Sequence, residues 1–317
     1  MARARKARDY APDFDGTFGD GALAVARQDV AFGRWQGPAD LLRDTGTDWD
    51  RRTHRVRLLA QAAAGTSVVE EWHTARPRDP DALVLRAETE VMRCFNLAMA
   101  AGGAAGVDTT RLESAVGTCL RAAEAHPADP MPWVSLLTVA RLFEGGHRHA
   151  DRWWHELQLR DRDNREAHHQ VLRHMSARWH GSHGAMYNFA RDVAGSIPAG
   201  SPLAVLLQLA RAEEYRYRLD HEGEQALGLG QHWRGELALA DTRRTWDLWI
   251  VGWDGRHRAQ DTADLNYLLH AACHGGLDDE AAHLFDLVGT AATRVPWSYH
   301  GDPAAVITQW HTRVTGS

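Results

Sequence analysis

The sequence contains almost no lysine and few cysteines. Lys6 is the single lysine among 317 residues, so nearly every basic side chain is an arginine. We attribute this bias to codon usage in a GC-rich, bacterial genome rather than to function. The three cysteines are odd in number and widely spaced, which argues against a disulfide framework or a zinc knuckle. This cysteine usage fits a reducing, cytoplasmic setting.

Long apolar runs and excess positive charge are also absent. No stretch of eighteen apolar residues occurs, so no membrane span is expected. The basic segment from Met1 to Asp9 is not followed by an apolar core, so no signal peptide is expected either. The net charge of −6 argues against a nucleic-acid binder that relies on bulk positive charge. We therefore expect a cytoplasmic protein with neither a nucleic acid nor a membrane as its partner.

Helical periodicity dominates the pattern of apolar residues, and alternating apolar and polar runs are nearly absent. The periodicity predicts helices over 21–32, 51–63, 67–75, 80–101, 109–125, 131–144, 147–159, 164–175, 183–195, 202–219 and about 302–313, with a further pair on either side of Gly275-Gly276. Pro80 suits a first helical turn, and Asp163 and Ser182 suit N-caps. These features predict an all-α fold, with a flexible tail at 1–20, a helical domain at 21–317 and a possible sub-boundary near 102–108.

A repeat is visible at the starts of several helical units. The segments are Pro77-Arg78-Asp79-Pro80, Pro127-Ala128-Asp129-Pro130 and the shorter Arg162-Asp163-Asn164. The step from Asp129 to Asp163 is 34 residues (163 − 129), which is the tetratricopeptide period. The step from Asp79 to Asp129 is 50 residues (129 − 79), so that unit carries an insertion or longer helices. The spacing predicts antiparallel helical hairpins stacked as a tetratricopeptide-like solenoid.

Two short motifs carry a family resemblance. The segment Arg178-Trp179-His180-Gly181-Ser182 resembles the Arg-Trp-Gly-Gly-Ser turn of an uncharacterised bacterial family with tetratricopeptide-like helices. The later segment Val295-Pro296-Trp297-Ser298-Tyr299 is similar to the C-terminal end of that family. His180 stands where the family has glycine, so the turn is not identical. The resemblance implies a helical-repeat fold and no known activity.

Histidine is abundant, at 19 residues, and eight of these lie between His147 and His183. Three Glu-x-x-His steps occur, at Glu70–His73, Glu166–His169 and Glu280–His283. Residues three apart share a helix face, so each step could offer a carboxylate and an imidazole to one divalent metal ion. The most suggestive group is Glu166 and His169 with His180 or His183. The alternative is that these side chains simply form solvated helix faces.

Aromatic and arginine side chains are the candidates for a ligand or partner surface. Thirteen tryptophans are present, and several arginines are interleaved with tyrosines and glutamates. The residues that we expect on such a surface are Trp153, Trp154, Arg178, Trp179, Arg211 and Arg216. The alternative is that the tryptophans pack adjacent hairpins together and the arginines form salt bridges along helices.

No phosphate-binding loop, dinucleotide fingerprint, nucleophile elbow or His-Glu-x-x-His helix occurs. The repeat and these missing motifs favour an interaction module that presents a concave surface to a protein or peptide partner. The alternative is a metal- or small-molecule-dependent enzyme with an interhelical site around the His147–His183 cluster.

Overall fold

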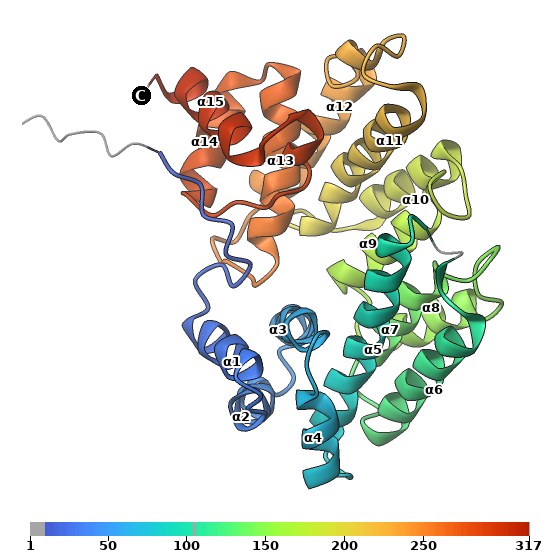
Figure 1. Cartoon of the computed structure of the whole chain (residues 1–317). Coiled ribbons are helices and arrows are strands. Elements are labelled where there is room, and N and C mark those ends of the chain that lie inside the picture. The colour runs from blue at the N-terminus through green and yellow to red at the C-terminus, as the bar shows by residue number, and fades with distance from the viewer. Residues whose placement is uncertain (1–9, 104–105, 317) are drawn as a thin grey trace, which may run out of the picture. The chain divides into compact units, whose positions relative to one another are not determined.

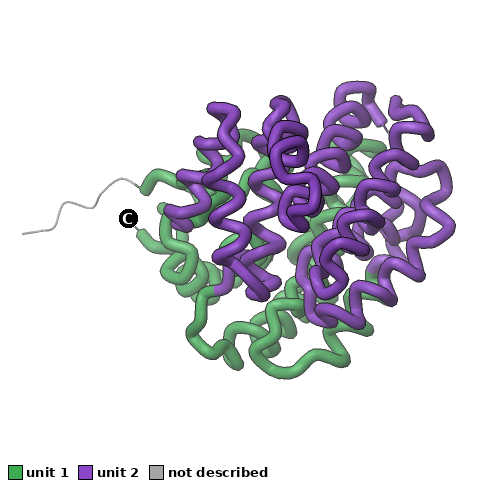
Figure 2. Tube along the Cα trace, turned by 90° about the horizontal axis from the view of Figure 1, so that it is seen from below, with its two compact units in different colours: residues 1–18, 187–257, 261–317 green, residues 19–186, 258–260 purple. Residues whose placement is uncertain are grey.

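The computed structural model describes residues 10–103 and 106–316, which form fifteen α-helices and no strand (Figure 1). Helix accounts for 68% of the chain, so the all-α prediction is confirmed. None of these helices combines the length and the apolarity needed to cross a bilayer. The chain divides into two compact units, shown in different colours in Figure 2, and consecutive helices contact each other within each unit.

Unit 2 contains residues 19–186 and 258–260. Its helices are α1 (Gly21–Ala31), α2 (Gln36–Thr45), α3 (Trp49–Ala63), α4 (Val68–Ala75), α5 (Pro80–Ala100), α6 (Thr109–Ala125), α7 (Met131–Ala140), α8 (Ala150–Gln158) and α9 (Arg165–His174). Helices α5 and α6 contact each other on either side of 102–108, where a sub-boundary was expected. That sub-boundary falls partly on residues 104–105, outside the described residues, and stays a prediction.

Unit 1 contains the described residues 10–18, 187–257 and 261–316, and α10 (His183–Ser196) begins just before its second segment. Its other helices are α11 (Leu206–Glu222), α12 (Glu236–Thr245), α13 (Asp261–Gly275), α14 (Asp278–Val288) and α15 (Pro303–Thr315). Short 3-10 helices at Pro202–Val205, Leu229–Gln231 and Trp297–His300 and a π turn at Trp246–Ile250 complete it.

Residues 10–18, which we expected in a flexible tail, lie against the end of unit 1. The Asp13 amide donates to the Thr290 carbonyl at 2.7 Å, and the Ala292 amide donates back to Asp13 at 2.7 Å. The Tyr10 ring stacks on His311 with ring centres 3.9 Å apart. The first nine residues of the expected tail lie outside the described part of the chain.

The predicted helices correspond closely to the observed ones, except that α2 and α12 had no prediction. Neither has a side-chain cap, and the first turn of α2 contains Gly37 and Pro38, which disfavour a helix interior but are tolerated in a first turn. The cap of α9 is Asn164, whose side chain accepts from the Ala167 amide, rather than Asp163. Ser182 caps α10 as expected, with its hydroxyl accepting from the Ala185 amide at 3.2 Å.

One buried arginine ties together four helices of unit 2. Arg52 on α3 is 2% exposed and donates to Asp129 at 2.8 Å, to Asp81 at 2.6 Å and to the Leu42 carbonyl at 3.2 Å. Asp129 lies two residues before α7, Asp81 is in the first turn of α5, and Leu42 is in the body of α2. Burial alone would raise the pKa of the Asp129 carboxyl, but His126 and Arg52 hold it below its ordinary value.

We expect Arg52→Ala to lower the free energy of unfolding by about 3–5 kcal/mol, because it leaves the buried Asp129 carboxylate without its cation. Urea unfolding followed by circular dichroism measures this change. The matched control is Arg51→Ala, since Arg51 is exposed and pairs with the exposed Asp48. A loss of less than about 1 kcal/mol for Arg52→Ala would show that Arg52 stabilises the fold no more than an ordinary surface ion pair does.

Candidate metal centre

Two of the three residues at the candidate metal centre lie on α13 of unit 1. His270 and His274 are four residues apart, so their side chains project from the same face of this helix. The helix is almost entirely buried from Leu265 to Cys273, which places His270 inside the unit. The third residue, His300, ends the 3-10 helix Trp297–His300, where Gly301 at φ 128° turns the chain toward α15.

The three imidazole rings converge. One ligand atom from each ring lies within 4.8 Å of the others. The ring centres of His270 and His274 are 4.4 Å apart, those of His270 and His300 5.0 Å, and those of His274 and His300 4.0 Å. In the part of the chain that the structure describes, no other group of three histidine, cysteine, aspartate or glutamate side chains meets this criterion.

Four of the six ring nitrogens of this His270/His274/His300 triad are buried without hydrogen-bond partners. Both nitrogens of His270, Nε2 of His274 and Nε2 of His300 have no partner among the described residues. Burial lowers the pKa of His270 well below its ordinary value, that of His274 to about 3 and that of His300 to about 4. The rings are therefore neutral at pH 7, which is the form that ligates a metal ion.

Aromatic side chains surround the triad. Trp233 and Trp297 contact the His270 ring edge-on, with ring centres 4.7 Å and 5.1 Å away. Trp310 contacts His274 in the same way at 5.1 Å. The Tyr215 hydroxyl lies 3.4 Å from Nδ1 of His300. If His300 binds through Nε2, its Nδ1 carries the proton and donates to Tyr215, an arrangement that orients metal-bound imidazoles in other proteins.

This partly buried triad could hold a metal ion. Zinc binds imidazole nitrogen at about 2.0–2.1 Å, so tetrahedral ligand atoms are roughly 3.3 Å apart. The nitrogens need to approach one another by an ångström or so, and the stacked rings of His274 and His300 need to tilt. Each buried nitrogen that lacks a partner costs about 1–3 kcal/mol. A bound metal ion would remove this cost for the nitrogens that it coordinates.

The histidines predicted from the sequence lie in unit 2 and do not form such a group. Glu166 pairs with Arg57 at 3.1 Å and accepts a hydrogen bond from Gln170. His169 is buried and close enough to Glu166 to affect its ionisation. His180 Nε2 contacts the Arg141 carbonyl at 2.8 Å, and His183 lies at the start of α10. A metal at Glu166, His169 and His180 or His183 stays a prediction, while an arginine already neutralises Glu166.

The residues expected on a partner surface differ in exposure. Trp153 is 3% exposed, and Arg211 is 7% exposed and forms an ion pair with Asp241 at 2.5 Å, so both are core residues. The other four, Trp154, Arg178, Trp179 and Arg216, keep some exposed surface. Of the six predicted residues, Trp154, Arg178 and Trp179 in unit 2 and Arg216 in unit 1 therefore remain candidates for contact with a partner.

The sequence contains a signal for the triad, although the predicted metal site did not include these three histidines. His270 and His274 form a His-x-x-x-His pair on a predicted helix, whereas the predicted metal site was based on carboxylate–imidazole pairs. His300 directly follows Val295-Pro296-Trp297-Ser298-Tyr299, a segment considered only for its resemblance. His274 and His300 are 26 positions apart in the sequence (300 − 274), with α14 between them, so their proximity is not visible in the sequence.

No family model, curated protein or solved structure matches this chain. The all-helical character that the resemblance implied is present, but no family is identified.

Glu166 gives a prediction on the pH dependence of stability. Burial opposes its ionisation, but the charges of Arg57, His169 and Arg173 and the Gln170 hydrogen bond lower its pKa to about 2. A carboxyl group whose pKa is lower in the folded chain than in the unfolded chain stabilises the fold at pH values above its unfolded pKa of 4.5. This contribution is lost as the pH falls from 4.5 toward 2. The full shift corresponds to roughly 3 kcal/mol.

We therefore expect Glu166→Gln to flatten the fall in unfolding free energy between pH 5 and pH 3. Urea titrations at several pH values measure this slope. The control is Glu124→Gln, the same chemical change at an exposed position of unit 2. Equal slopes in wild type and Glu166→Gln would show that Arg57 does not hold the carboxylate in its charged form.

Proposed function

We propose that this protein binds a divalent transition-metal ion through His270, His274 and His300 and that the ion is its functional centre. The observation that carries the proposal is the set of four buried, unpartnered ring nitrogens on three converging imidazoles. Buried polar atoms are almost always satisfied in folded proteins, so such a concentration calls for an explanation. A metal ion provides one, since imidazole nitrogen is a common metal ligand.

The donor set favours zinc among the available metals. Imidazole suits zinc, copper, iron and nickel, whereas magnesium and calcium prefer oxygen ligands. Structural zinc sites usually have four protein ligands, and catalytic sites have three with one position open. Only three candidate ligands converge in the described residues. Neutral ligands also leave the ion its full charge. We therefore propose a Lewis-acid centre that acts on an oxygen-containing substrate.

Metal titration tests this proposal. We expect wild-type protein to bind one equivalent of Zn²⁺ by calorimetry and to give the visible spectrum of four-coordinate Co²⁺. His270→Ala, His274→Ala and His300→Ala should each weaken binding by at least about 100-fold, and Tyr215→Phe by about tenfold, because Tyr215 only orients a ligand.

The matched control is His283→Ala, which removes an exposed histidine of α14 in the same unit. It should bind metal like the wild type. Helical circular dichroism of every variant separates loss of the ligand from loss of the fold. Unchanged affinity in all three triad variants, or equal weakening by His283→Ala, would contradict the proposed centre.

An interaction module remains a second candidate function, with the helices stacked as tetratricopeptide-like hairpins. Contacts between consecutive helices and the 34-residue step support this arrangement. The partner surface would include Trp179, which lies beside Phe95 and under the Arg141 guanidinium, 5.0 Å from its ring centre. The expected partner is a protein or peptide that stacks on the tryptophan.

Photo-crosslinking from position 178 in the host tests this second candidate. A benzoylphenylalanine in place of Arg178 should capture one protein reproducibly, and Trp179→Ala should abolish that capture. The control places the same crosslinker at Arg162, an exposed position of unit 2. Identical products from both positions would argue against a specific surface.

A further inference from the structure

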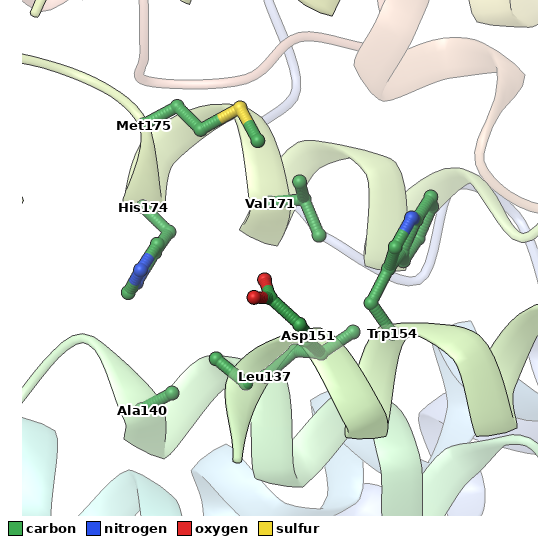
Figure 3. A pocket seen from close by; sticks show the side chains of 8 residues that line it. Leu137, Ala140, Asp151, Trp154, Val171, His174 and Met175 are labelled. Carbon is green, nitrogen blue, oxygen red and sulfur yellow. The ribbon is translucent and has the colours of Figure 1, made fainter. Parts of the chain in front are cut away.

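A small pocket lies in unit 2 and is formed by three consecutive helices. Its lining comes from Leu137 and Ala140 of α7, from Ala150, Asp151 and Trp154 of α8, and from Val171, His174 and Met175 at the end of α9. Figure 3 shows the Asp151 carboxylate directed into the space between α8 and α9, with His174 and Trp154 on opposite sides. The metal proposal uses none of these residues.

The pocket carries one negative charge in otherwise apolar surroundings. Asp151 is exposed at the mouth, and its carboxylate forms no hydrogen bond or ion pair with a described residue. Leu137, Ala140 and Val171 provide buried apolar walls. The Trp154 ring and the Met175 sulfur add polarisable surface, which attracts cations and apolar groups alike.

His174 lines the pocket without adding positive charge. Burial, followed by the charges of His180 and Arg141, lowers the pKa of His174 to about 4, so the ring is neutral at pH 7. Its Nδ1 is buried and has no hydrogen-bond partner among the residues described. Gly146, at φ 84°, lets the ring lie close, because a Cβ there would be 2.8 Å from His174 Cε1. The nearby Arg141 guanidinium lies over the Phe95 and Trp179 rings.

The size of the pocket limits the group that it can hold. Its volume is ≈ 50 Å³. An engineered cavity of about 150 Å³ binds benzene, which has six heavy atoms. A third of that volume accommodates roughly two heavy atoms, so a quaternary ammonium group does not fit. A primary ammonium group fits, with the rest of its molecule extending to solvent.

We propose that this pocket, formed by Asp151, Trp154 and His174, binds the primary ammonium group of an alkylamine or of a lysine side chain. The carboxylate of Asp151 balances the charge, the neutral ring of His174 adds no opposing charge, and the ring of Trp154 contacts the methylene groups beside the nitrogen. Because Asp151 is exposed, its attraction is screened by solvent, and the affinity is in the millimolar range, as for weak ion pairs.

The test uses the full chain in the presence of a chelator, with n-butylammonium as the probe and NMR chemical shifts as the readout. The neutral isostere butan-1-ol should bind at least about tenfold more weakly, because it lacks the charge. Tetramethylammonium should also bind at least about tenfold more weakly, because it exceeds the pocket volume. The perturbed amide signals should come from α7, α8 and the end of α9.

Variants locate the site. Asp151→Asn should weaken n-butylammonium binding by about tenfold. The matched control Asp163→Asn removes an equal charge from an exposed position of the same unit and should leave binding within about twofold. Equal binding of butan-1-ol and n-butylammonium, or equal weakening by both variants, would overturn the proposal.

A comparison with N-acetyl-lysine amide distinguishes the two sources of the ammonium group. Tighter binding than n-butylammonium would support a lysine side chain of a partner protein. Equal or weaker binding, with n-butylammonium still dependent on Asp151, would support a free amine. If neither cation perturbs the pocket amides at tens of millimolar, the pocket does not recognise ammonium groups.

Discussion

The helices of unit 2 depend on the pairing of charges that their packing removes from water. Arg52 is inside the unit, and its guanidinium meets two carboxylates and a carbonyl that belong to three other helices. An isolated buried guanidinium or carboxylate would cost several kcal/mol, so these helices are stable only in positions that bring the partners together. Apolar burial supplies most of the driving force, and the paired charges select one arrangement among the many that bury similar area.

The same rule makes the His270/His274/His300 triad unusual. In unit 2, Arg52, Asp129 and Glu166 each have partners at hydrogen-bond distance. In the triad, burial has instead suppressed protonation, and the neutral rings meet one another with unsatisfied nitrogens. Packing alone could have used leucine or phenylalanine here without that cost. Keeping three imidazoles is therefore better explained by something that binds them than by the stability of the core.

The sequence predicted most helices because their signals are local. Pro80, the Ser182 cap and Gly276 after α13 act within a few residues of the helix end that they define. Helices α2 and α12 have no side-chain N-cap, and tertiary contacts with their neighbours stabilise them instead. Tertiary contacts also hold residues 10–18, which were expected in a flexible tail: backbone hydrogen bonds pair this segment with residues 290–292.

Little of the candidate site could be predicted in this way. A pair such as His270 and His274 can be read from helical periodicity, but its convergence with His300 depends on how α13, α14 and the Trp297–His300 turn pack. The histidine-rich segment 147–183 attracted the prediction because its density is visible in one dimension. Density along the chain measures composition, whereas a metal site requires that unshared electron pairs point to one place.

The two candidate functions also differ in what the fold must supply. A partner surface needs exposed side chains, and burial of Trp153 and Arg211 leaves a smaller set than the sequence suggested. A metal centre needs enclosed, neutral nitrogens held by rigid elements, which α13 and its aromatic neighbours provide. A helical scaffold permits either function. Buried polar atoms without hydrogen-bond partners destabilise the folded state, whereas half-exposed tryptophans do not. The triad is therefore the stronger indication of function.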